Sequence, residues 1–151
     1  MKKKLLFSIL FFSLTTILIS YALEAIFEYF DVFEKDFNGP KFNNLTQELF
    51  IAIIFAPLIE TFVFQSVIYY LVKLFDSFLK KYFVSVYLII SSLLFALSHS
   101  YSIYYEIATF FIGLIFAYSF LYFKKESNYP ILCVAIIHSL YNAFVTLMDY
   151  I

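Results

Sequence analysis

The sequence predicts an all-α protein, a polytopic membrane helix bundle of about five transmembrane helices. Of its 151 residues, 64% are hydrophobic and only 14% are charged, and the mean hydropathy is +0.90. Soluble domains have about 25% charged residues. Because a short chain leaves much of its surface exposed, this apolar excess cannot be hidden in a core. Five apolar runs also approach or exceed the roughly 20 residues that a spanning helix needs.

Each predicted span is an apolar run with polar ends. The runs cover residues 5–23, 49–72, 82–99, 107–123 and 130–148. We expect residues 1–23 to form an N-terminal transmembrane helix that acts as a signal anchor, although a cleavable signal peptide is the alternative. Residues 24–48 are expected to form an extracytoplasmic linker, with turn signals at Gly39-Pro40 and Asn43-Asn44. Residues 49–151 then form the membrane domain.

The positions of the lysines predict the orientation. In a five-span arrangement most of them fall on one side of the membrane: Lys2, Lys3, Lys4, Lys73, Lys80, Lys81, Lys124 and Lys125. The other side receives only Lys35 and Lys41. Since cytoplasmic loops are enriched in Lys and Arg, the N-terminus is predicted in the cytoplasm and the C-terminus outside. The expected location is the plasma membrane, with the lipid bilayer as a partner.

Other classes of function have no support in the chain. It has no Arg, no Gly-rich phosphate loop and no basic-aromatic surface, so nucleic acid is not an expected partner. A single cysteine, Cys133, allows no internal disulfide and no Cys/His zinc pattern.

Four of the polar residues inside the apolar runs are the candidates for a site: Glu60, His99, His138 and Asn142. Intramembrane ionisable groups are costly and usually mark a site. Glu60 and His138 have similar predicted depths, whereas His99 lies about 9 Å farther from the lysine end at 1.5 Å per residue. A tilted helix would remove this mismatch. His138 and Asn142 are four residues apart, so they share a helix face.

These groups suit the hydrolysis of an amide. Burial disfavours the charged form of a carboxyl group, which makes Glu60 a competent general base for water. One histidine can relay the proton, and the other, with Asn142, can donate to an oxyanion. No Ser or Cys stands in a nucleophile motif. The alternative interpretation is structural hydrogen bonding between helices.

Three motifs carry a family resemblance. The stretch Ala56-Pro57-Leu58-Ile59-Glu60-Thr61-Phe62-Val63-Phe64-Gln65 resembles a Glu-Glu-x-x-x-Arg motif that follows a Pro. Phe95-Ala-Leu-Ser-His99 matches Phe-x-x-x-His, and His138-Ser-Leu-Tyr-Asn142 matches His-x-x-x-Asn. Together with Phe110-Phe111-Ile112-Gly113, they make the chain similar to the type II CAAX prenyl endopeptidases. This family is also called the CAAX protease and bacteriocin-processing (CPBP) intramembrane proteases.

The sequence departs from the motif at two positions. Thr61 replaces the second Glu, and Gln65 replaces the Arg. In the family these positions could form an ion pair; here both are neutral and can still form hydrogen bonds. Losing both charges leaves no unpaired charge, so we interpret the pair as a compensated variant. In an α-helix Glu60 would point about 140° away from Gln65, so the base does not depend on that pair.

The resemblance implies roles for the site residues. Glu60 and His99 would activate water, His138 and Asn142 would stabilise the oxyanion, and Phe95 would support the histidines. The family has been described as both metalloprotease-like and glutamate-dependent. Glu60, His99 and His138 would be the ligands if Zn²⁺ bound, but no cofactor is expected, because a helical His-Glu-x-x-His motif is absent.

The expected function is therefore an intramembrane endopeptidase that hydrolyses a peptide bond of a membrane-embedded or membrane-bound peptide or protein. Prenylated substrates and bacteriocin-like precursors are both compatible with the resemblance. The alternative is a catalytically weak or inactive immunity or regulatory binding protein on the same fold. A proton-coupled transporter ranks last, since polar residues occupy only part of three helices.

Overall fold

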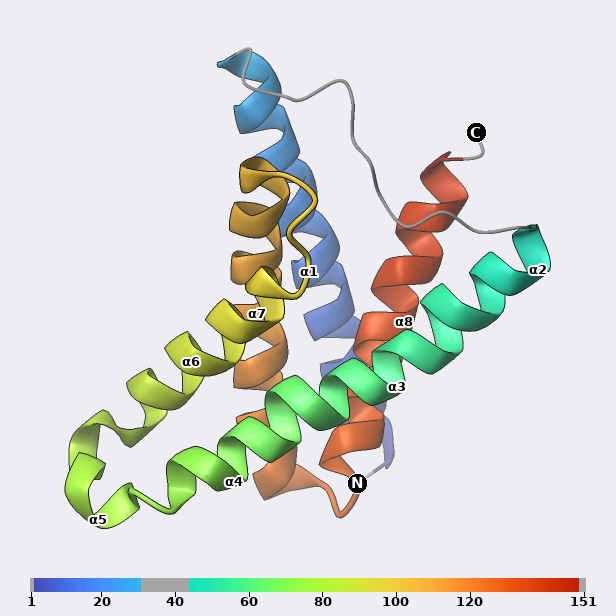
Figure 1. Cartoon of the computed structure of the whole chain (residues 1–151). Coiled ribbons are helices and arrows are strands. Elements are labelled where there is room, and N and C mark those ends of the chain that lie inside the picture. Colours follow the sequence, from blue (N-terminus) through green and yellow to red (C-terminus); the bar gives the residue numbers. More distant parts are fainter. Residues whose placement is uncertain (1, 31–43, 150–151) are drawn as a thin grey trace.

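The computed structural model describes residues 2–30 and 44–149 (Figure 1). In chain order its elements are α1 (Lys2–Tyr29), α2 (Leu45–Glu48), η1 (Leu49–Phe55), α3 (Ala56–Glu60), η2 (Thr61–Val67), α4 (Ile68–Lys73), α5 (Asp76–Leu79), η3 (Lys80–Tyr82), α6 (Phe83–Leu97), α7 (Ile103–Glu126) and α8 (Pro130–Asp149). No strand occurs in the part of the chain that the structure describes. The predicted all-α class is confirmed.

Among the described residues, five helical segments are long and apolar enough to cross a membrane: Lys3–Tyr29, Leu49–Lys73, Asp76–Leu97, Ile103–Glu126 and Pro130–Met148. The predicted number of spans is confirmed. Helix α1 continues past Leu23, where the sequence placed the start of the linker, to Tyr29. The rest of that linker falls mostly on residues 31–43, with Lys35, Lys41 and the Gly39-Pro40 turn, which lie outside the described residues.

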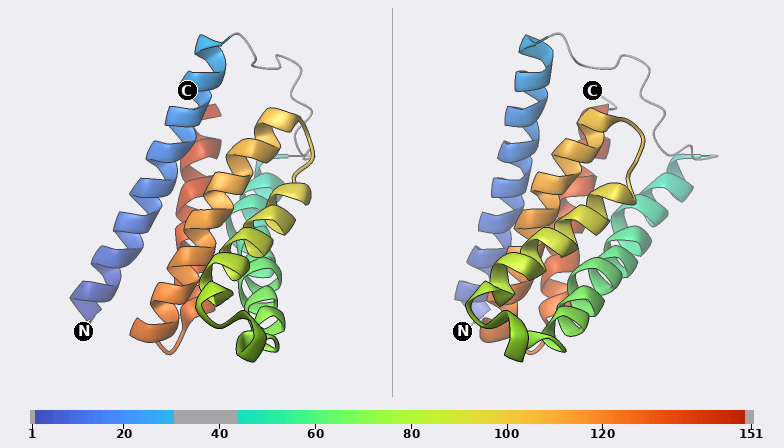
Figure 2. Two further views of the ribbon diagram at one scale, coloured as in Figure 1. Left: turned by 90° about the vertical axis from the view of Figure 1, so that its left-hand side faces the viewer. Right: turned by 60° about the vertical axis from the view of Figure 1, so that its left-hand side comes forward.

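Helix α7 occupies the centre of the bundle. It packs against α1, α6 and α8, and Figure 2 shows it between them. In its most apolar stretch 44% of the residues are buried, against 22–28% in the other spans. Its fully buried rings form the middle of the core, at Phe116, Phe120 and Phe123.

The second span is one continuous helix from residue 45 to residue 73 that contains two π-helical segments. Segments η1 and η2 are π-helical, and they flank the short α-helical turn α3. The residues at the junctions, Phe55, Glu60 and Val67, all keep right-handed helical dihedrals. Pro57 lies in α3, and its ring would clash with the carbonyl four residues earlier in a regular α-helix. One π-helical segment ends at Phe55, just before Pro57, and the other begins at Thr61, just after α3.

Helix α1 packs against the bundle through apolar and polar contacts. Ile9 and Phe12 are part of the hydrophobic core. Three polar pairs join the helix to α7 and α8: Lys4–Glu126 at 2.7 Å, Ser8–Tyr122 at 2.9 Å and Ser20–Tyr141 at 3.0 Å. Such interhelical hydrogen bonds and close contacts replace the hydrophobic driving force that lipid cannot supply.

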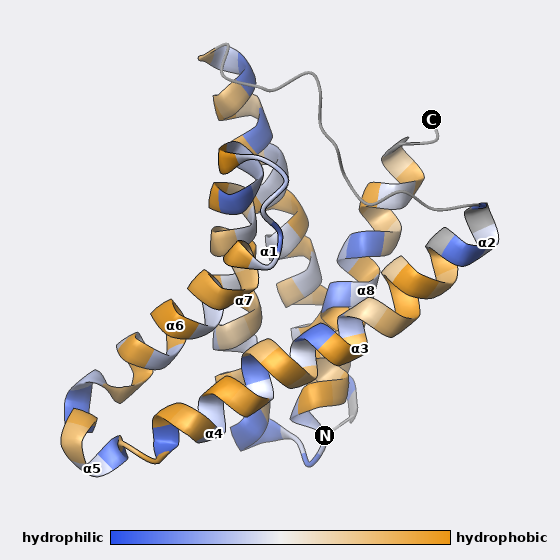
Figure 3. Cartoon of the chain, in the orientation of Figure 1, coloured by the Kyte–Doolittle hydropathy of each residue, from blue (hydrophilic) through white to orange (hydrophobic). Residues whose placement is uncertain are grey.

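The surface and the ends of the bundle have the polarity that a bilayer requires. Large apolar side chains such as Phe7, Leu74 and Phe78 are exposed, and Figure 3 shows apolar residues over most of α4 and α6. Lys4 contacts Glu126 and Lys124 contacts Tyr70, so these lysines share one end of the bundle. This is the arrangement that the predicted orientation requires; which side is cytoplasmic stays a prediction.

Gly113 allows α6 and α7 to approach closely. A Cβ atom at this position would lie 3.1 Å from Phe95 Cδ1 and 3.1 Å from the Cα atom of Ser92. The second of these atoms belongs to the backbone, so it can move only if α6 moves.

We therefore expect Gly113→Ala to lower the stability of the protein by about 1–3 kcal/mol, the usual cost of overpacking, and Gly113→Leu to lower it further. Thermal unfolding in detergent micelles measures the effect. Phe111→Leu, at an exposed position of the same helix, is the control and should leave the unfolding temperature nearly unchanged. An unchanged unfolding temperature in Gly113→Leu would contradict this packing.

Candidate active site

The carboxyl group of Glu60 meets both histidines of the chain. Glu60 Oε2 lies 3.6 Å from His99 Nε2 and 3.8 Å from His138 Nε2. Glu60 ends α3, His99 follows α6 and His138 lies within α8. Three helices that are distant in sequence therefore bring their ionisable groups to one point. The depth mismatch predicted for His99 disappears because α6 crosses the bundle obliquely, as Figure 1 shows.

The ring orientation of His99 is set by its own helix. Its Nδ1 lies 2.8 Å from the carbonyl oxygen of Phe95. A carbonyl oxygen only accepts, so Nδ1 must carry the proton and donate it. In the neutral imidazole, Nε2 then has a free lone pair, and this is the atom that faces Glu60. At 3.6 Å the two atoms are neighbours without a direct hydrogen bond.

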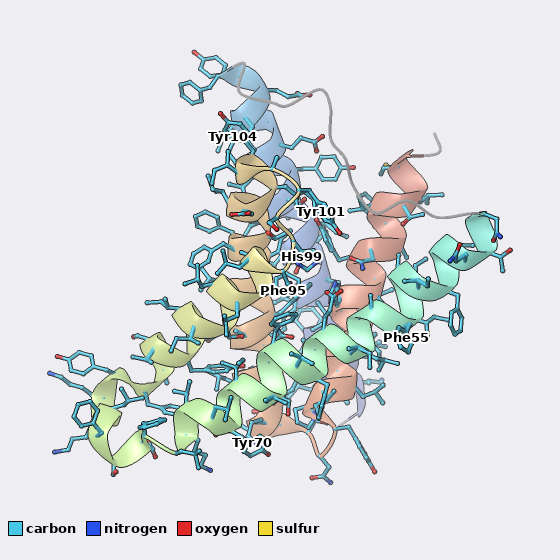
Figure 4. The ribbon with its side chains drawn as sticks, viewed as in Figure 1. Phe55, Tyr70, Phe95, His99, Tyr101 and Tyr104 are labelled. Atoms are coloured by element: carbon cyan, nitrogen blue, oxygen red, sulfur yellow. The ribbon has the colours of Figure 1, made fainter. Side chains whose placement is uncertain are left out.

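Aromatic rings surround the outer part of His99. Its ring centroid lies 6.5 Å from that of Tyr101 and 6.2 Å from that of Tyr105. Figure 4 shows His99 between Phe95 and Tyr101, where α6 ends. The His99 side chain keeps 17% of its surface exposed and that of Glu60 keeps 24%, so neither side chain is fully enclosed.

His138 is held in a closed aromatic pocket. Its side chain is only 5% exposed. The ring packs on Phe116 at a centroid distance of 4.6 Å and on Phe95 at 5.8 Å. Phe95 also contacts the ring of His99, at 4.5 Å. This single residue therefore contacts both imidazoles; the supporting role that the resemblance implied for it stays a prediction.

Some polar atoms of His138 and Glu60 form no hydrogen bond. Within the described ranges, His138 Nδ1 and Glu60 Oε2 are buried without a hydrogen-bond partner. An unpaired acceptor is less unusual than an unpaired N–H group. This favours the tautomer of His138 whose proton is on Nε2, the nitrogen that faces Glu60.

Asn142 lies one turn from His138 on α8, but its amide has a different partner from the one expected. Asn142 Nδ2 donates to the backbone carbonyl oxygen of Ala52, in η1, at 2.7 Å. One of the two amide N–H groups is thus used to join α8 to the second span. Only the other N–H is left for a reacting group.

Thr61 and Gln65 do not form the hydrogen bond that their spacing allowed. Both side chains are fully buried. Thr61 Oγ1 and both polar atoms of the Gln65 amide have no hydrogen-bond partner among residues 2–30 and 44–149. The reason is the winding of η2, because residues four apart do not stack directly in a π-helix, whose bonds join residues five apart. For the same reason the angle of about 140° predicted between Glu60 and Gln65 does not apply.

Two residues of α6 contribute to the site region and were not singled out in the sequence. Tyr87 donates its hydroxyl to the carbonyl oxygen of Gln65 at 3.1 Å, and Ser91 donates to that of Phe64 at 2.8 Å. The accepting carbonyls lie in the π-helical segment η2. The sequence signal for Tyr87 and Ser91 was their spacing of four residues within an apolar run, since this spacing places two hydroxyls on one helix face.

The polar cluster does not have the geometry of a metal centre. In the described part of the chain, no group of three or more His, Cys, Asp and Glu residues could hold a metal ion. This finding applies to Glu60, His99 and His138, the ligands expected if zinc bound. The expectation that the protein uses no cofactor stays a prediction.

The comparisons with known proteins extend this description. The family model described as type II CAAX prenyl endopeptidase Rce1-like matches residues 42–144, more than half of the chain. The match includes Glu60, His99, His138 and Asn142 and excludes α1. No curated protein and no solved structure matches the chain.

The interpretation of Thr61 and Gln65 as a compensated neutral pair can be tested by introducing the Glu and Arg of the family motif. Thr61→Glu and Gln65→Arg each place an unpaired charge at a fully buried position, so each should destabilise the protein by about 3–5 kcal/mol. The double variant should lose less than either single variant, because the longer Glu and Arg side chains can reach each other where Thr61 and Gln65 do not. Thermal unfolding in detergent provides the measurement. Losses that simply add in the double variant would rule out the interpretation as a compensated pair.

Proposed function

The chain belongs to the type II CAAX prenyl endopeptidase Rce1-like family, and on that premise we propose that it is an intramembrane endopeptidase that uses glutamate-activated water. That it is a membrane protein of the CAAX protease type follows from the family and the five spans. The catalytic reaction is our proposal. The observation that carries it is the convergence of Glu60 Oε2 with His99 Nε2 and His138 Nε2.

The first step is the activation of water. A water molecule that bonds to Glu60 and His99 can reach both, since their polar atoms are 3.6 Å apart. The carboxylate of Glu60 takes one proton as the water oxygen attacks the carbonyl carbon of the substrate. Because Nδ1 of His99 is committed to the backbone, its Nε2 lone pair faces the water and orients it. Protonated Glu60 then gives the proton to the leaving amine, and the C–N bond breaks.

The second step is the stabilisation of the oxyanion that forms on the substrate. His138 has the suitable donor, an N–H at Nε2 beside Glu60. The surrounding rings of Phe95 and Phe116 fix its orientation. A preorganised donor in a site of low polarity stabilises developing charge strongly. The N–H of Asn142 that is not bonded to Ala52 is the second donor in this proposal.

The substrate class follows from where the site lies. Glu60, His99 and His138 lie between helices whose outer faces are apolar, which favours a peptide that reaches the site from the bilayer or its surface. We propose a membrane-embedded or membrane-bound peptide or protein as substrate. Prenylated proteins and bacteriocin-like precursors are the two candidate groups.

The second candidate function is a non-catalytic immunity or regulatory protein. The observation in its favour is the neutral pair Thr61 and Gln65, whose side-chain polar atoms are buried without partners among the described residues. In this case the polar cluster would serve binding and not hydrolysis.

Reconstitution with a library of membrane-associated peptides separates the two functions. We expect the wild type to cleave some members, and Glu60→Gln and His99→Ala to lose about 100-fold or more in rate, the size of a general acid–base contribution. Mass spectrometry of the products identifies the cleaved bond. Both variants must keep the wild-type unfolding temperature within a few degrees for the comparison to hold.

Glu106→Gln is the matched control, because Glu106 is a carboxyl residue in the first turn of α7, outside the cluster. It should keep full activity. A cellular phenotype that survives Glu60→Gln would favour the binding function and contradict the proposed hydrolysis.

A further inference from the structure

Pro57 leaves one particular carbonyl oxygen without its helical donor. In an α-helix, the N–H of residue 57 would bond to the carbonyl of Ile53; in a π-helix, it would bond to that of Ala52. The segment before Pro57, η1, is π-helical. Since proline has no N–H, the acceptor that lacks a donor in this register is the carbonyl oxygen of Ala52.

The side chain of Asn142 supplies a donor to this same carbonyl. Asn142 Nδ2 lies 2.7 Å from Ala52 O, which is short for an N–H···O hydrogen bond. The donor comes from another helix, 90 residues later in the sequence. Within a bilayer no water replaces a missing donor, so an unpaired carbonyl costs several kcal/mol there. An interhelical bond that fills this place is therefore strongly favoured.

This bond also places the reacting groups relative to one another. Pro57 precedes Glu60 by three residues, and Asn142 follows His138 by four on α8. Joining Asn142 to the turn before Pro57 holds α8 against the second span beside Glu60, whose Oε2 lies 3.8 Å from His138 Nε2. A change in the register of that turn would rotate Glu60 away from the histidines.

We propose that Asn142 is a positioning residue whose amide replaces the N–H that Pro57 lacks, and that this replacement sets the place of Glu60 beside His138. The proposal rests on the proposed function, because it describes how the same site is assembled. It differs from a role for Asn142 in which its amide contacts only the substrate.

The other side of Glu60 is held in a similar way. Ser91 and Tyr87 of α6 donate to the carbonyl oxygens of Phe64 and Gln65 in η2. Glu60 thus stands between two wide helical turns, and side chains from neighbouring helices bond to the carbonyls of both. Asn142 differs from Ser91 and Tyr87 because the carbonyl to which it donates lacks a backbone donor owing to Pro57.

A double-mutant cycle between Pro57 and Asn142 tests the proposal. Pro57→Ala restores an N–H at residue 57, which can bond to Ala52 O. Asn142→Leu removes the donor and keeps a side chain of similar volume. We expect Asn142→Leu to shift the unfolding equilibrium by about tenfold or more in the wild-type background and by much less in the Pro57→Ala background. Unfolding in detergent gives this result without any substrate.

Cleavage kinetics provide the readout that a purely structural role would not change. With a cleaved peptide in hand, Asn142→Leu should lower kcat with little change in KM, since misplacement of the base affects the chemical step. Loss of the oxyanion donor alone would lower kcat equally in both backgrounds, so the positioning role predicts a smaller loss in kcat from Asn142→Leu in the Pro57→Ala background. Asn142→Ala repeats the cycle in case leucine does not fit.

Tyr141→Phe is the control for the cycle. It removes another interhelical hydrogen bond of α8, to Ser20 of α1, and its effect should be equal in both backgrounds. An effect of Asn142→Leu and Asn142→Ala that is also equal in both backgrounds would overturn the proposal. Failure of the proposed function is distinct, because it would appear as unchanged cleavage in Glu60→Gln, while the unfolding cycle would still give its own result.

Discussion

The contact between the Glu60 carboxyl group and two imidazoles is the interaction on which the rest of the site depends. A carboxyl group inside a bilayer has a high free energy unless other groups stabilise its proton or its charge. Here Nε2 of His99 and Nε2 of His138 lie within 4 Å of one carboxylate oxygen. The oblique path of α6, the position of α8 and the aromatic contacts of Phe95 all serve to keep these three groups together.

The second span shows how a membrane helix can position a reactive residue without a loop. Backbone carbonyls of its π-helical turns before and after α3 accept hydrogen bonds from side chains of other helices. In lipid these donors must come from the protein, and the structure supplies them from α6 and α8. Small polar residues inside apolar runs, such as Ser91, are therefore part of the backbone hydrogen bonding of a neighbouring helix.

Helix α1 lies outside the residues that match the family model, yet it is integrated into the bundle. It buries Ile9 and Phe12 against the central helix and forms a hydrogen bond to Tyr141, which is next to Asn142 on α8. Contacts of this kind stabilise the helix that carries His138. In the structure, the first span is thus a component of the folded unit.

The sequence by itself showed that the helices lie in a lipid bilayer, how many spans there are and which polar residues they carry. Hydropathy and motif spacing are local properties, so they can be read along the chain. The sequence placed Glu60, His138 and His99 in apolar runs and indicated that they should meet. It could not determine that α6 lies obliquely, since helix tilt results from packing against neighbours such as Gly113 of α7. Nor could it show the π-helical turns: the partner of Asn142 is a backbone carbonyl of Ala52, which no side-chain pattern marks. These features depend on contacts between residues far apart in the chain, so only the tertiary structure decides them.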